Sequence, residues 1–402
     1  MENKDLDFAS LAVFYEPEEH SQSINYPLYM SANFEYGGDV YDRITQGARK
    51  EVNIYSRCGN PTEYQFEEHV ARLAGGTACL ATASGMAAIS HALFGILKAG
   101  DHLIADLTTY SSTHEFFDHR AQDFGLEVTL VDCTDVSRVR AAIRPETKVL
   151  YFEAIANPTM KVAPMADLVA LAHEHGIVVI CDNTFASPAI CRPHDFGVDV
   201  VVESATKFIG GHNDAVGGVI TQNSKILPAD WLEDVRWNTL NKLGAPISPF
   251  NAWLLLRGAQ TLALRAERQC QSAATIAAWL DAHDQVERVF YPGLASHPNH
   301  AAAKVQLRNF GSMLSFKVAN EELGVQILKN LRLCAFAASL GGVRTTMQVP
   351  GTMAFLDIPL QERIAMGIEP GLVRISVGIE HVDDIIHDIE QAMVKAIAQQ
   401  TA

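Results

Sequence analysis

The sequence predicts an α/β protein whose main sheet is mostly parallel and is followed by a smaller α+β domain. Seven short apolar or β-branched runs are separated mainly by stretches long enough for a helix. This alternation is typical of strands that are buried on both faces. After about Asn251 it gives way to a long apolar helix and two further strands. A chain of 402 residues is long enough for two such domains.

The predicted elements start after an irregular arm over residues 1–60, which prolines and paired glycines interrupt. A large domain is predicted over residues 61–255, with a helix over Ala166–His175 that ends at Gly176. Its predicted strands are Cys79–Ala83, His102–Ala105, Glu127–Val131, Val149–Phe152, Ile177–Cys181, Val198–Val202 and Gly217–Thr221.

The C-terminal domain, predicted over residues 256–402, takes in most of a long helix from Ala252 to about His283. Strands near Met313–Val318 and Leu372–Val377 follow, and an amphipathic helix over Val382–Ala398 closes the chain. The crevice between two domains of this kind is the expected place for a cofactor site.

The composition disfavours several classes of partner. A formal charge of −16 argues against nucleic acid and anionic membrane surfaces, which both require excess Lys and Arg. No run of about 18 apolar residues is present to span a bilayer, and the acidic start Met1–Asp7 lacks an apolar signal core. The seven scattered cysteines show no zinc-binding spacing, so we expect no metal and a reducing, cytoplasmic location.

One lysine has the surroundings of a cofactor-binding residue. Lys207 follows a predicted buried strand together with the hydroxyl residues Ser204 and Thr206. Its amine can condense with an aldehyde cofactor whose phosphate the hydroxyls bind, although a lone lysine at a strand end is usually a solvated charge. Asp182 ends the preceding buried strand, and pyridoxal phosphate needs an acid that keeps its ring nitrogen protonated. The pair therefore predicts pyridoxal-phosphate chemistry.

Two further segments can complete such a site. Ser84, Gly85 and Met86 follow a strand and open a helix, where free N–H groups make a phosphate seat, with an ordinary N-cap serine as the alternative. Tyr110 follows the next strand and can stack on a planar cofactor ring, or is a plain loop tyrosine. The chain lacks G-x-G-x-x-G and G-x-x-x-x-G-K-[ST], which weakens the dehydrogenase and NTPase interpretations.

Two arginines are predicted to contact anions. Arg57 lies in the arm, which we expect to reach a neighbouring subunit, whereas a surface turn is the alternative. Arg374 interrupts an apolar strand and must find an anion, either a substrate α-carboxylate or an acidic neighbour such as Glu380. Glu153 and Asn157 follow another strand and are positioned to line the cofactor face.

Seven motifs, in this order, make the chain resemble the Cys/Met-metabolism (trans-sulfuration) family of pyridoxal-phosphate enzymes. The resemblance covers nearly the whole chain from about Tyr26 and implies fold type I, the fold of the aspartate aminotransferases. The motifs are YSRxGNPT at Tyr55–Thr62, SGMAA at Ser84–Ala88, the tyrosine loop at Tyr110, DNTFASP at Asp182–Pro188, SATKFIGGH at Ser204–His212, SLGG at Ser339–Gly342 and LVRISVGIE at Leu372–Glu380.

The resemblance implies a role for each matching residue. Lys207 would hold the cofactor and carry protons, Asp182 would pair with the ring nitrogen, and Tyr110 would stack on the ring and protonate the leaving group. The phosphate ligands implied are Ser84, Gly85, Met86, Ser204 and Thr206, with Tyr55 and Arg57 from the neighbouring subunit of a homotetramer, a dimer of catalytic dimers. The substrate carboxylate would be held by Arg374, Ser339 and Asn157.

Several positions depart from the family pattern where substrates are chosen. Ser112 stands where the methionine γ-lyases carry a cysteine, and Arg344 where the lyases usually show glutamate. Val349–Phe355 replaces a segment that usually contains histidines, and Glu115 adds a polar group to the tyrosine loop. Leu243–Asn251 looks more like the O-acetylhomoserine sulfhydrylases. Ser112, Glu115 and Arg344 are therefore expected near the substrate.

These features favour γ-elimination on an amino acid of the L-homoserine or L-homocysteine type. The leaving group need not be a plain thiol, and the guanidinooxy group of canavanine is one candidate that Glu115 suits. The alternative is γ-replacement, as in O-acetylhomoserine sulfhydrylase or cystathionine γ-synthase. The remaining alternative is a non-catalytic binding protein on the same fold.

Overall fold

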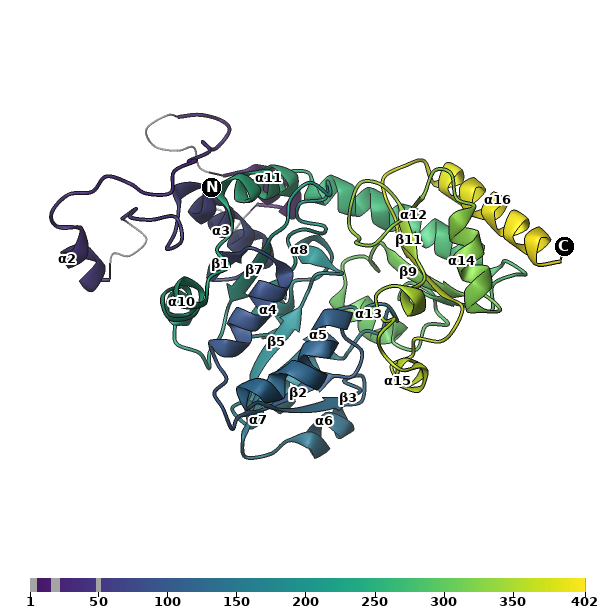
Figure 1. The fold of residues 1–402 in the computed structure, drawn as a ribbon, viewed down its shortest axis with the longest axis horizontal. Coiled ribbons are helices and arrows are strands. Elements are labelled where there is room, and N and C mark those ends of the chain that lie inside the picture. The colour runs from purple at the N-terminus through teal and green to yellow at the C-terminus, as the bar shows by residue number, and fades with distance from the viewer. Residues whose placement is uncertain (1–5, 16–21, 48–51, 402) are drawn as a thin grey trace.

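The computed structural model describes residues 6–15, 22–47 and 52–401, so parts of the predicted arm, including most of the acidic start, lie outside the described residues. Two sheets organise the described chain. A seven-stranded sheet occupies the N-terminal part, and a five-stranded sheet lies on its C-terminal side (Figure 1).

The seven-stranded sheet is mostly parallel. Its strands are β1 (Ala78–Thr82), β2 (His102–Asp106), β3 (Glu127–Val131), β4 (Thr147–Glu153), β5 (Val178–Asp182), β6 (Val200–Glu203) and β7 (Gly218–Gln222). The spatial order is β1-β7-β6-β5-β4-β2-β3, and only β7 runs antiparallel to its neighbours. This confirms the α/β class, and each of the seven predicted strands is present within about two residues.

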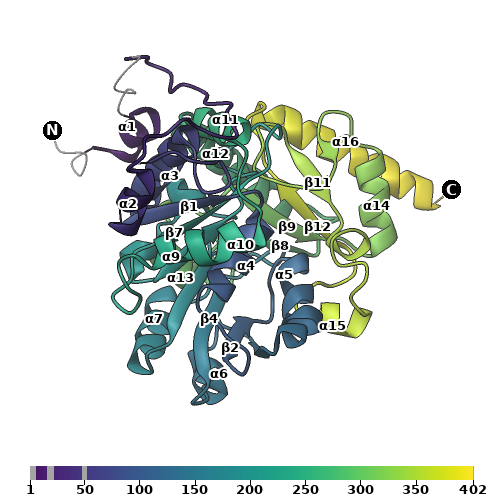
Figure 2. The same cartoon turned by 60° about the vertical axis from the view of Figure 1, so that its left-hand side comes forward.

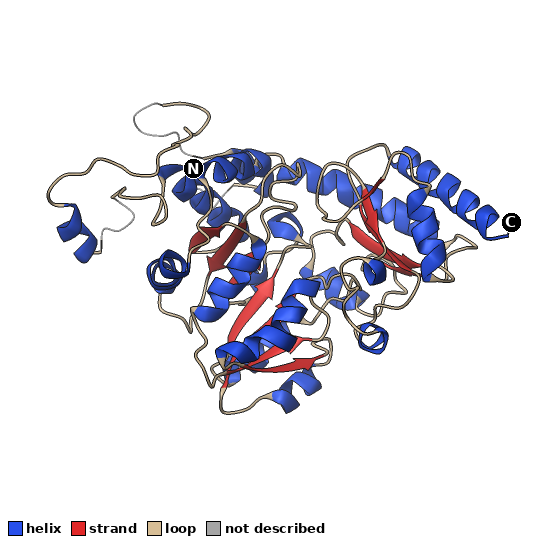
Figure 3. Ribbon diagram, viewed as in Figure 1, coloured by secondary structure: helices blue, strands red, loops and turns tan. Residues whose placement is uncertain are grey.

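Separate hydrophobic cores cover the two faces of this sheet. Leu150 and Phe152 of β4 pack into the core that contains α7 (Met165–Glu174), whereas Val149 and Tyr151 pack into the core that contains α4 (Gly85–Phe94). Alternate residues of one strand point to opposite faces, so a strand buried on both faces is apolar throughout. Helices consequently lie on both sides of the red strands in Figure 3.

Short helices precede the sheet and connect its strands. The bounds of those not yet given are α1 (Phe8–Val13), α2 (Val40–Thr45), α3 (Pro61–Ala74), α5 (Ser111–Glu115), α6 (Val136–Ala142), α8 (Ser187–Ile190), α9 (Trp231–Asp234) and α10 (Asn241–Leu243). Two of them, α1 and α2, lie in the arm that the sequence predicted to be irregular.

The second sheet has the order β10-β11-β12-β9-β8. Its strands are β8 (Arg288–Phe290), β9 (Met313–Lys317), β10 (Ala335–Phe336), β11 (Thr346–Gln348) and β12 (Leu372–Ser376), and its helices are α13 (His300–Gln306), α14 (Glu321–Lys329), α15 (Leu360–Ala365) and α16 (Val382–Thr401). α14 and α16 lie side by side next to this sheet (Figures 1 and 2). The sequence predicted β9, β12 and α16, whereas β8, β10 and β11 are too short to leave a periodic pattern.

The prediction of one long helix from Ala252 to His283 is wrong in one respect, because the structure has two helices there. α11 (Pro249–Ala259) and α12 (Leu262–Asp281) meet at Gln260 and Thr261. The break lies where α11 comes closest to the turn after β6, since a Cβ on Gly258 would lie 2.2 Å from the Gly210 carbonyl oxygen. This close packing of α11 on the turn is a tertiary feature that helical periodicity does not report. The predicted domain boundary at residues 255 and 256 falls inside α11 and stays a prediction.

Three observations concern the remaining expectations from composition. Cys79 and Cys181 are buried core residues, as predicted. In the described part of the chain no helix is both long and apolar enough to cross a bilayer. Residues 6–15, 22–47 and 52–401 contain no group of three or more His, Cys, Asp or Glu arranged to hold a metal ion.

Leu150→Ala is expected to lower the free energy of unfolding by about 2–5 kcal/mol, because the side chain is only 1% exposed and its loss leaves a cavity in the core. The matched control is Leu264→Ala on α12, which removes the same atoms from a side chain that is 70% exposed and should cost less than about 1 kcal/mol. Urea unfolding of both variants measures the difference, and equal losses would contradict this core assignment.

Candidate active site

A cavity of about 710 Å³ lies between the carboxyl ends of the central strands and the second sheet. Residues from both sheets line it, including Glu153 and Asp182 from the ends of β4 and β5 and Arg374 from β12. The predicted site residues that line it are Ser84, Gly85, Met86, Tyr110, Asn157, Asp182, Ser204, Thr206, Lys207, Ser339 and Arg374. Segments far apart in the sequence therefore form one site.

Lys207 lies in a tight turn directly after β6. The turn is closed by backbone bonds in which the Lys207 amide donates to the Ser204 carbonyl (3.1 Å) and the Gly211 amide donates to the Lys207 carbonyl (2.7 Å). Arg265 of α12 donates to the carbonyls of Phe208 (2.7 Å) and Ile209 (3.2 Å), which fixes the same turn from outside. The break between α11 and α12 therefore lies beside the turn that holds Lys207.

The Lys207 amine is prepared to act as a nucleophile. Its Nζ donates to the Ser339 Oγ at 2.8 Å. Burial, and secondly the positive charge of Arg374, lower the pKa of Lys207 to about 8. Both effects disfavour the ammonium form, so a far larger share of this amine is neutral near neutral pH than of an ordinary lysine.

Asp182 is a buried carboxylate without a cationic partner among the described residues. It accepts hydrogen bonds from the Thr184 amide (2.9 Å) and the Tyr151 hydroxyl (3.3 Å). Burial raises the pKa of Asp182, against the opposing effect of these hydrogen bonds. The protonated ring nitrogen of pyridoxal phosphate is a group that fits this site, because it would supply the missing positive charge.

The start of α4 lies directly against Ser204. Ser84 caps the helix, its Oγ accepting from the Ala87 amide at 3.1 Å. A Cβ on Gly85 would lie 2.7 Å from the Ser204 Cβ, so only glycine allows this approach. A helix N-terminus, the Ser204 hydroxyl and Thr206 thus meet at one end of the cavity, and this donor set fits a phosphate. Thr206 is held in place by Gly217, whose amide donates to its Oγ1 at 3.0 Å.

Arg374 is buried and lacks an acidic partner among the described residues. Its Nη1 donates to the Asn157 Oδ1 (2.9 Å) and its Nη2 to the Ser339 carbonyl (2.8 Å). With its amide oxygen turned toward the guanidinium, Gln348 accepts from Nη1 at 3.0 Å and from Nη2 at 3.1 Å. Glu380, the alternative partner considered from the sequence, instead accepts from the amide and hydroxyl of Thr345.

Burial lowers the pKa of Arg374 to about 9, which shows how poorly its charge is compensated by the neutral groups around it. A carboxylate that entered the cavity would supply the missing negative charge. This geometry fits an amino-acid substrate held by its α-carboxylate.

Tyr110 stands at the cavity wall with its phenol accessible. The residue is 40% exposed and precedes α5, and its amide donates to the Glu153 Oε1 at 2.5 Å. Glu153 thus fixes the backbone of Tyr110, while the tyrosine ring stays free to contact a ligand.

Tyr55 and Arg57 do not line the cavity of their own chain. Arg57 donates from Nε to the Asn241 Oδ1 (2.9 Å), and its guanidinium lies 5.2 Å from the centre of the Tyr55 ring. Tyr55 is 44% exposed. Their contribution to the site of a neighbouring subunit stays a prediction.

Ser112, Glu115 and Arg344, which the sequence predicts near the substrate, do not line this cavity, and their contact with a substrate stays a prediction. Ser112 and Glu115 do not line the cavity of this chain, whereas Ser111 does, because successive residues of α5 are rotated by about 100°. Arg344 is exposed and donates from Nη2 to the Leu333 carbonyl at 3.1 Å, so it adds no charge to the cavity wall.

Sequence reasoning also missed residues that line the cavity. These are Ile89, Ser111, Ile155, Thr184, Phe185, Val216, Ala338, Leu340 and Gln348. Met353 and Ala354 also line it, and they belong to the segment Val349–Phe355 that the sequence had already marked. Thr184 was findable, since it stands two residues after the aspartate at the end of β5. Gln348 carries no local signal, because it reaches Arg374 only through the pairing of β11 with β12.

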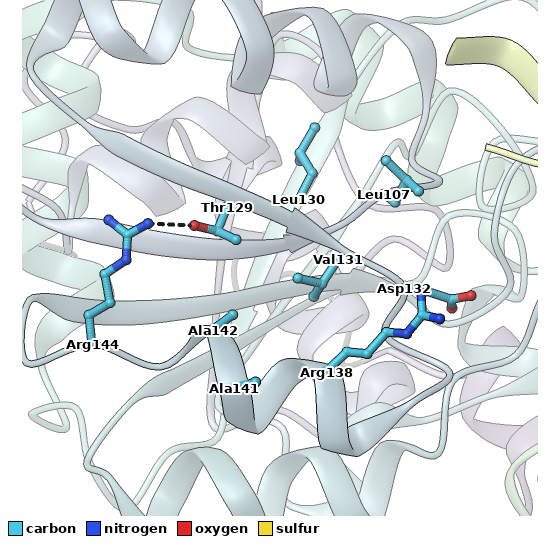
Figure 4. A pocket seen from close by; sticks show the side chains of 9 residues that line it. All are labelled: Leu107, Thr129, Leu130, Val131, Asp132, Arg138, Ala141, Ala142 and Arg144. Atoms are coloured by element: carbon cyan, nitrogen blue, oxygen red, sulfur yellow. Dashed lines mark hydrogen bonds between the residues drawn. The ribbon is translucent and has the colours of Figure 1, made fainter. Parts of the chain in front are cut away.

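A second, more open pocket of about 540 Å³ lies beside the edge strand β3 and α6 (Figure 4). Arg144 donates there to the Thr129 Oγ1 (3.1 Å) and the Glu127 Oε2 (2.8 Å), and Arg138 lies 3.4 Å from the Asp135 carboxylate. Both guanidinium groups are already paired, so the described residues that line this pocket offer no free cation to an anionic ligand.

Comparison with known proteins identifies the family. The model of the Cys/Met metabolism PLP-dependent enzyme family matches residues 10–394. An L-methionine gamma-lyase of Fusobacterium nucleatum subsp. polymorphum is 40% identical over 377 residues, covering 92% of this chain and 93% of the relative. A cystathionine beta-lyase of Lactococcus lactis subsp. cremoris is 38% identical, covering 93% and 94%. The chain belongs to the Cys/Met metabolism PLP-dependent enzyme family.

Solved structures agree with this assignment. A cystathionine gamma-lyase from Lactobacillus plantarum, complexed with L-serine, superposes with a TM-score of 0.90 at 33% identity, covering 97% of this chain and 99% of that one. A cystathionine gamma synthase from Xanthomonas oryzae pv. oryzae gives the same TM-score and identity over 98% and 99%. The protein is a pyridoxal-phosphate-dependent enzyme of the trans-sulfuration kind, a lyase or a γ-replacement enzyme, which confirms the predicted family and cofactor.

Labelling of Lys207 by an amine acylating reagent in the apoenzyme should rise as the pH passes about 8, because only the neutral amine reacts. In Arg374→Met the pH at which labelling is half-maximal should move upward, since the guanidinium charge is the second cause of the lowered pKa of Lys207. Mass spectrometry of the Lys207 peptide across a pH series measures it. A midpoint near the ordinary lysine value of about 10.4 would contradict the buried, charge-repelled amine.

Proposed function

We propose that the enzyme catalyses γ-elimination on an amino acid of the L-homoserine or L-homocysteine type, including one whose leaving group is not a thiol, such as the guanidinooxy group of canavanine. The observation that carries this proposal is the Lys207 amine, which shares one cavity with the uncompensated Arg374 guanidinium. A base and a carboxylate anchor in one cavity suit proton removal next to the α-carbon of a bound amino acid.

When bound, pyridoxal phosphate supplies an electron sink that stabilises negative charge on the substrate carbons. Asp182 would hold the proton on the ring nitrogen of the cofactor, and Tyr110 would contact the ring. The residues that would hold its phosphate are Ser84, Gly85, Met86, Ser204 and Thr206, and Tyr55 and Arg57 would join them from the neighbouring subunit of a homotetramer.

The chain's own residues then move protons around a fixed substrate. Arg374, helped by Asn157 and Ser339, fixes the α-carboxylate and so directs the Cα–H bond toward Lys207. The neutral Lys207 amine would accept the proton from Cα and pass it to another carbon of the conjugated system, which makes the amine neutral again so that it could accept one from Cβ. Its pKa near 8 permits this near neutral pH. Tyr110 donates a proton to the departing γ-substituent.

The guanidinooxy leaving group was suggested by Glu115, which does not line the cavity of this chain, so other residues would face the γ-substituent. Met353 and Ala354, from the segment that replaces the usual histidines, line the cavity. Ser111 places a hydroxyl next to Tyr110 in the same wall. γ-Replacement is the competing function, and the likeness to a solved cystathionine gamma synthase favours it to the same degree as elimination.

The holoenzyme should release 2-oxobutanoate and ammonia, or homoserine by addition of water, from L-canavanine, L-homocysteine or L-methionine without a second nucleophile. The test is a panel of these amino acids and O-acetyl-L-homoserine, with and without sulfide, assayed for the three products. Lys207→Ala should be about 10²–10⁴-fold slower and serves as the inactive control. Conversion of O-acetyl-L-homoserine that requires sulfide, with no turnover of the others, would reject elimination in favour of replacement.

A further inference from the structure

We propose that Glu153 is a positioning residue that couples Tyr110 to the Arg374 anchor, by holding the backbone amides of Tyr110 and Asn157 at the same time. The inference rests on the roles proposed above for Tyr110, Asn157 and Arg374. It adds a residue of the same cavity wall that holds both of their loops and sets the distance between the proton donor and the carboxylate anchor.

The two oxygens of the Glu153 carboxylate bind two different loops. Glu153 is the last residue of β4 and is 5% exposed. Its Oε1 accepts from the Tyr110 amide at 2.5 Å, and its Oε2 accepts from the Asn157 amide at 2.8 Å. One rigid side chain at a strand end therefore fixes both loops relative to the central sheet.

Each of these loops ends in a group that faces the cavity. Asn157 accepts from Arg374 at 2.9 Å, so Glu153 is one residue removed from the guanidinium that would hold the substrate. Tyr110 begins the other loop, and its own side chain lines the cavity. A shift of either amide would change the separation of the phenol from the guanidinium, and catalysis is sensitive to displacements of about 1 Å.

The position requires a carboxylate rather than an amide. Two N–H donors converge on this side chain, and a carboxylate offers an acceptor oxygen to each of them. A glutamine offers one oxygen and one NH₂, and that NH₂ would face an N–H donor. Burial, followed by the charge of Asp182, raises the pKa of Glu153 well above its usual range, and the two N–H bonds only partly oppose this rise. The convergence of two N–H donors is the geometric reason for an acceptor at both oxygens.

Glu203 provides a matched comparison on a neighbouring strand. It is likewise the last residue of its strand, β6, and is 2% exposed. It accepts from the Asn183 Nδ2 at 3.1 Å and does not line the cavity. Glu203→Gln therefore removes a buried strand-end carboxylate that does not hold the Tyr110 and Asn157 amides.

The test measures how Glu153→Gln changes the recognition of a carboxylate, with no turnover required. The dissociation constants of glycine and of methylamine are measured on holoenzyme from the absorbance change of the bound cofactor. Glu153→Gln should weaken glycine about tenfold and leave methylamine within about twofold, because a displaced Asn157 misaligns only the carboxylate anchor. Glu203→Gln should leave the ratio of the two constants as in the wild type.

A double-mutant cycle decides whether the effect passes through Asn157. In an Asn157→Ala background, Glu153→Gln should no longer change the glycine-to-methylamine ratio. An unchanged ratio in the single variant, the same change in both backgrounds, or an equal change in Glu203→Gln would each overturn the proposal. If Glu153→Gln does not fold, Glu153→Asp takes its place, and it should raise the glycine-to-methylamine ratio of dissociation constants by less while keeping the cofactor. These binding constants do not depend on which leaving group the enzyme eliminates, so failure of the elimination proposal would show separately in the substrate panel.

Discussion

A buried amine whose pKa is lowered, so that it loses its proton far more readily than an ordinary lysine, is the feature on which the site depends. Lys207 has a lowered pKa because it is removed from water and faces the charge of Arg374. Neither condition would persist if the turn after β6 could relax into solvent. Arg265 prevents this by donating to the Phe208 and Ile209 carbonyls, and the glycines at 210 and 258 allow α11 to approach. The break between two helices is thus part of the same arrangement.

The site also requires that the two sheets keep a fixed position relative to each other. Lys207 and Asn157 belong to the first sheet's loops, whereas Ser339 and Arg374 belong to the second part of the chain, and hydrogen bonds of 2.8–2.9 Å connect them. These neutral contacts leave the Arg374 charge uncompensated. An incoming carboxylate would therefore find a guanidinium that is already oriented, and binding would relieve the unpaired charge.

Much of this arrangement could be predicted from the sequence, and the reasons are local. Residues at the carboxyl ends of parallel strands meet at one edge of a sheet, so Asp182 and Lys207 were findable from the strand pattern alone. The partner of Arg374 was not, because Glu380 is near in sequence yet is bound to Thr345. Likewise, the outward position of Arg344 and the contact of Gln348 with Arg374 depend on tertiary packing and strand pairing, which leave no periodic signal.

Reduction of the holoenzyme with borohydride, followed by peptide mapping, tests the central claim most directly. The account predicts that one peptide carries the reduced cofactor and that the modified residue is Lys207, the described lysine that lines the cavity between the two sheets. A cofactor attached to any other lysine, or no attachment at all, would contradict it.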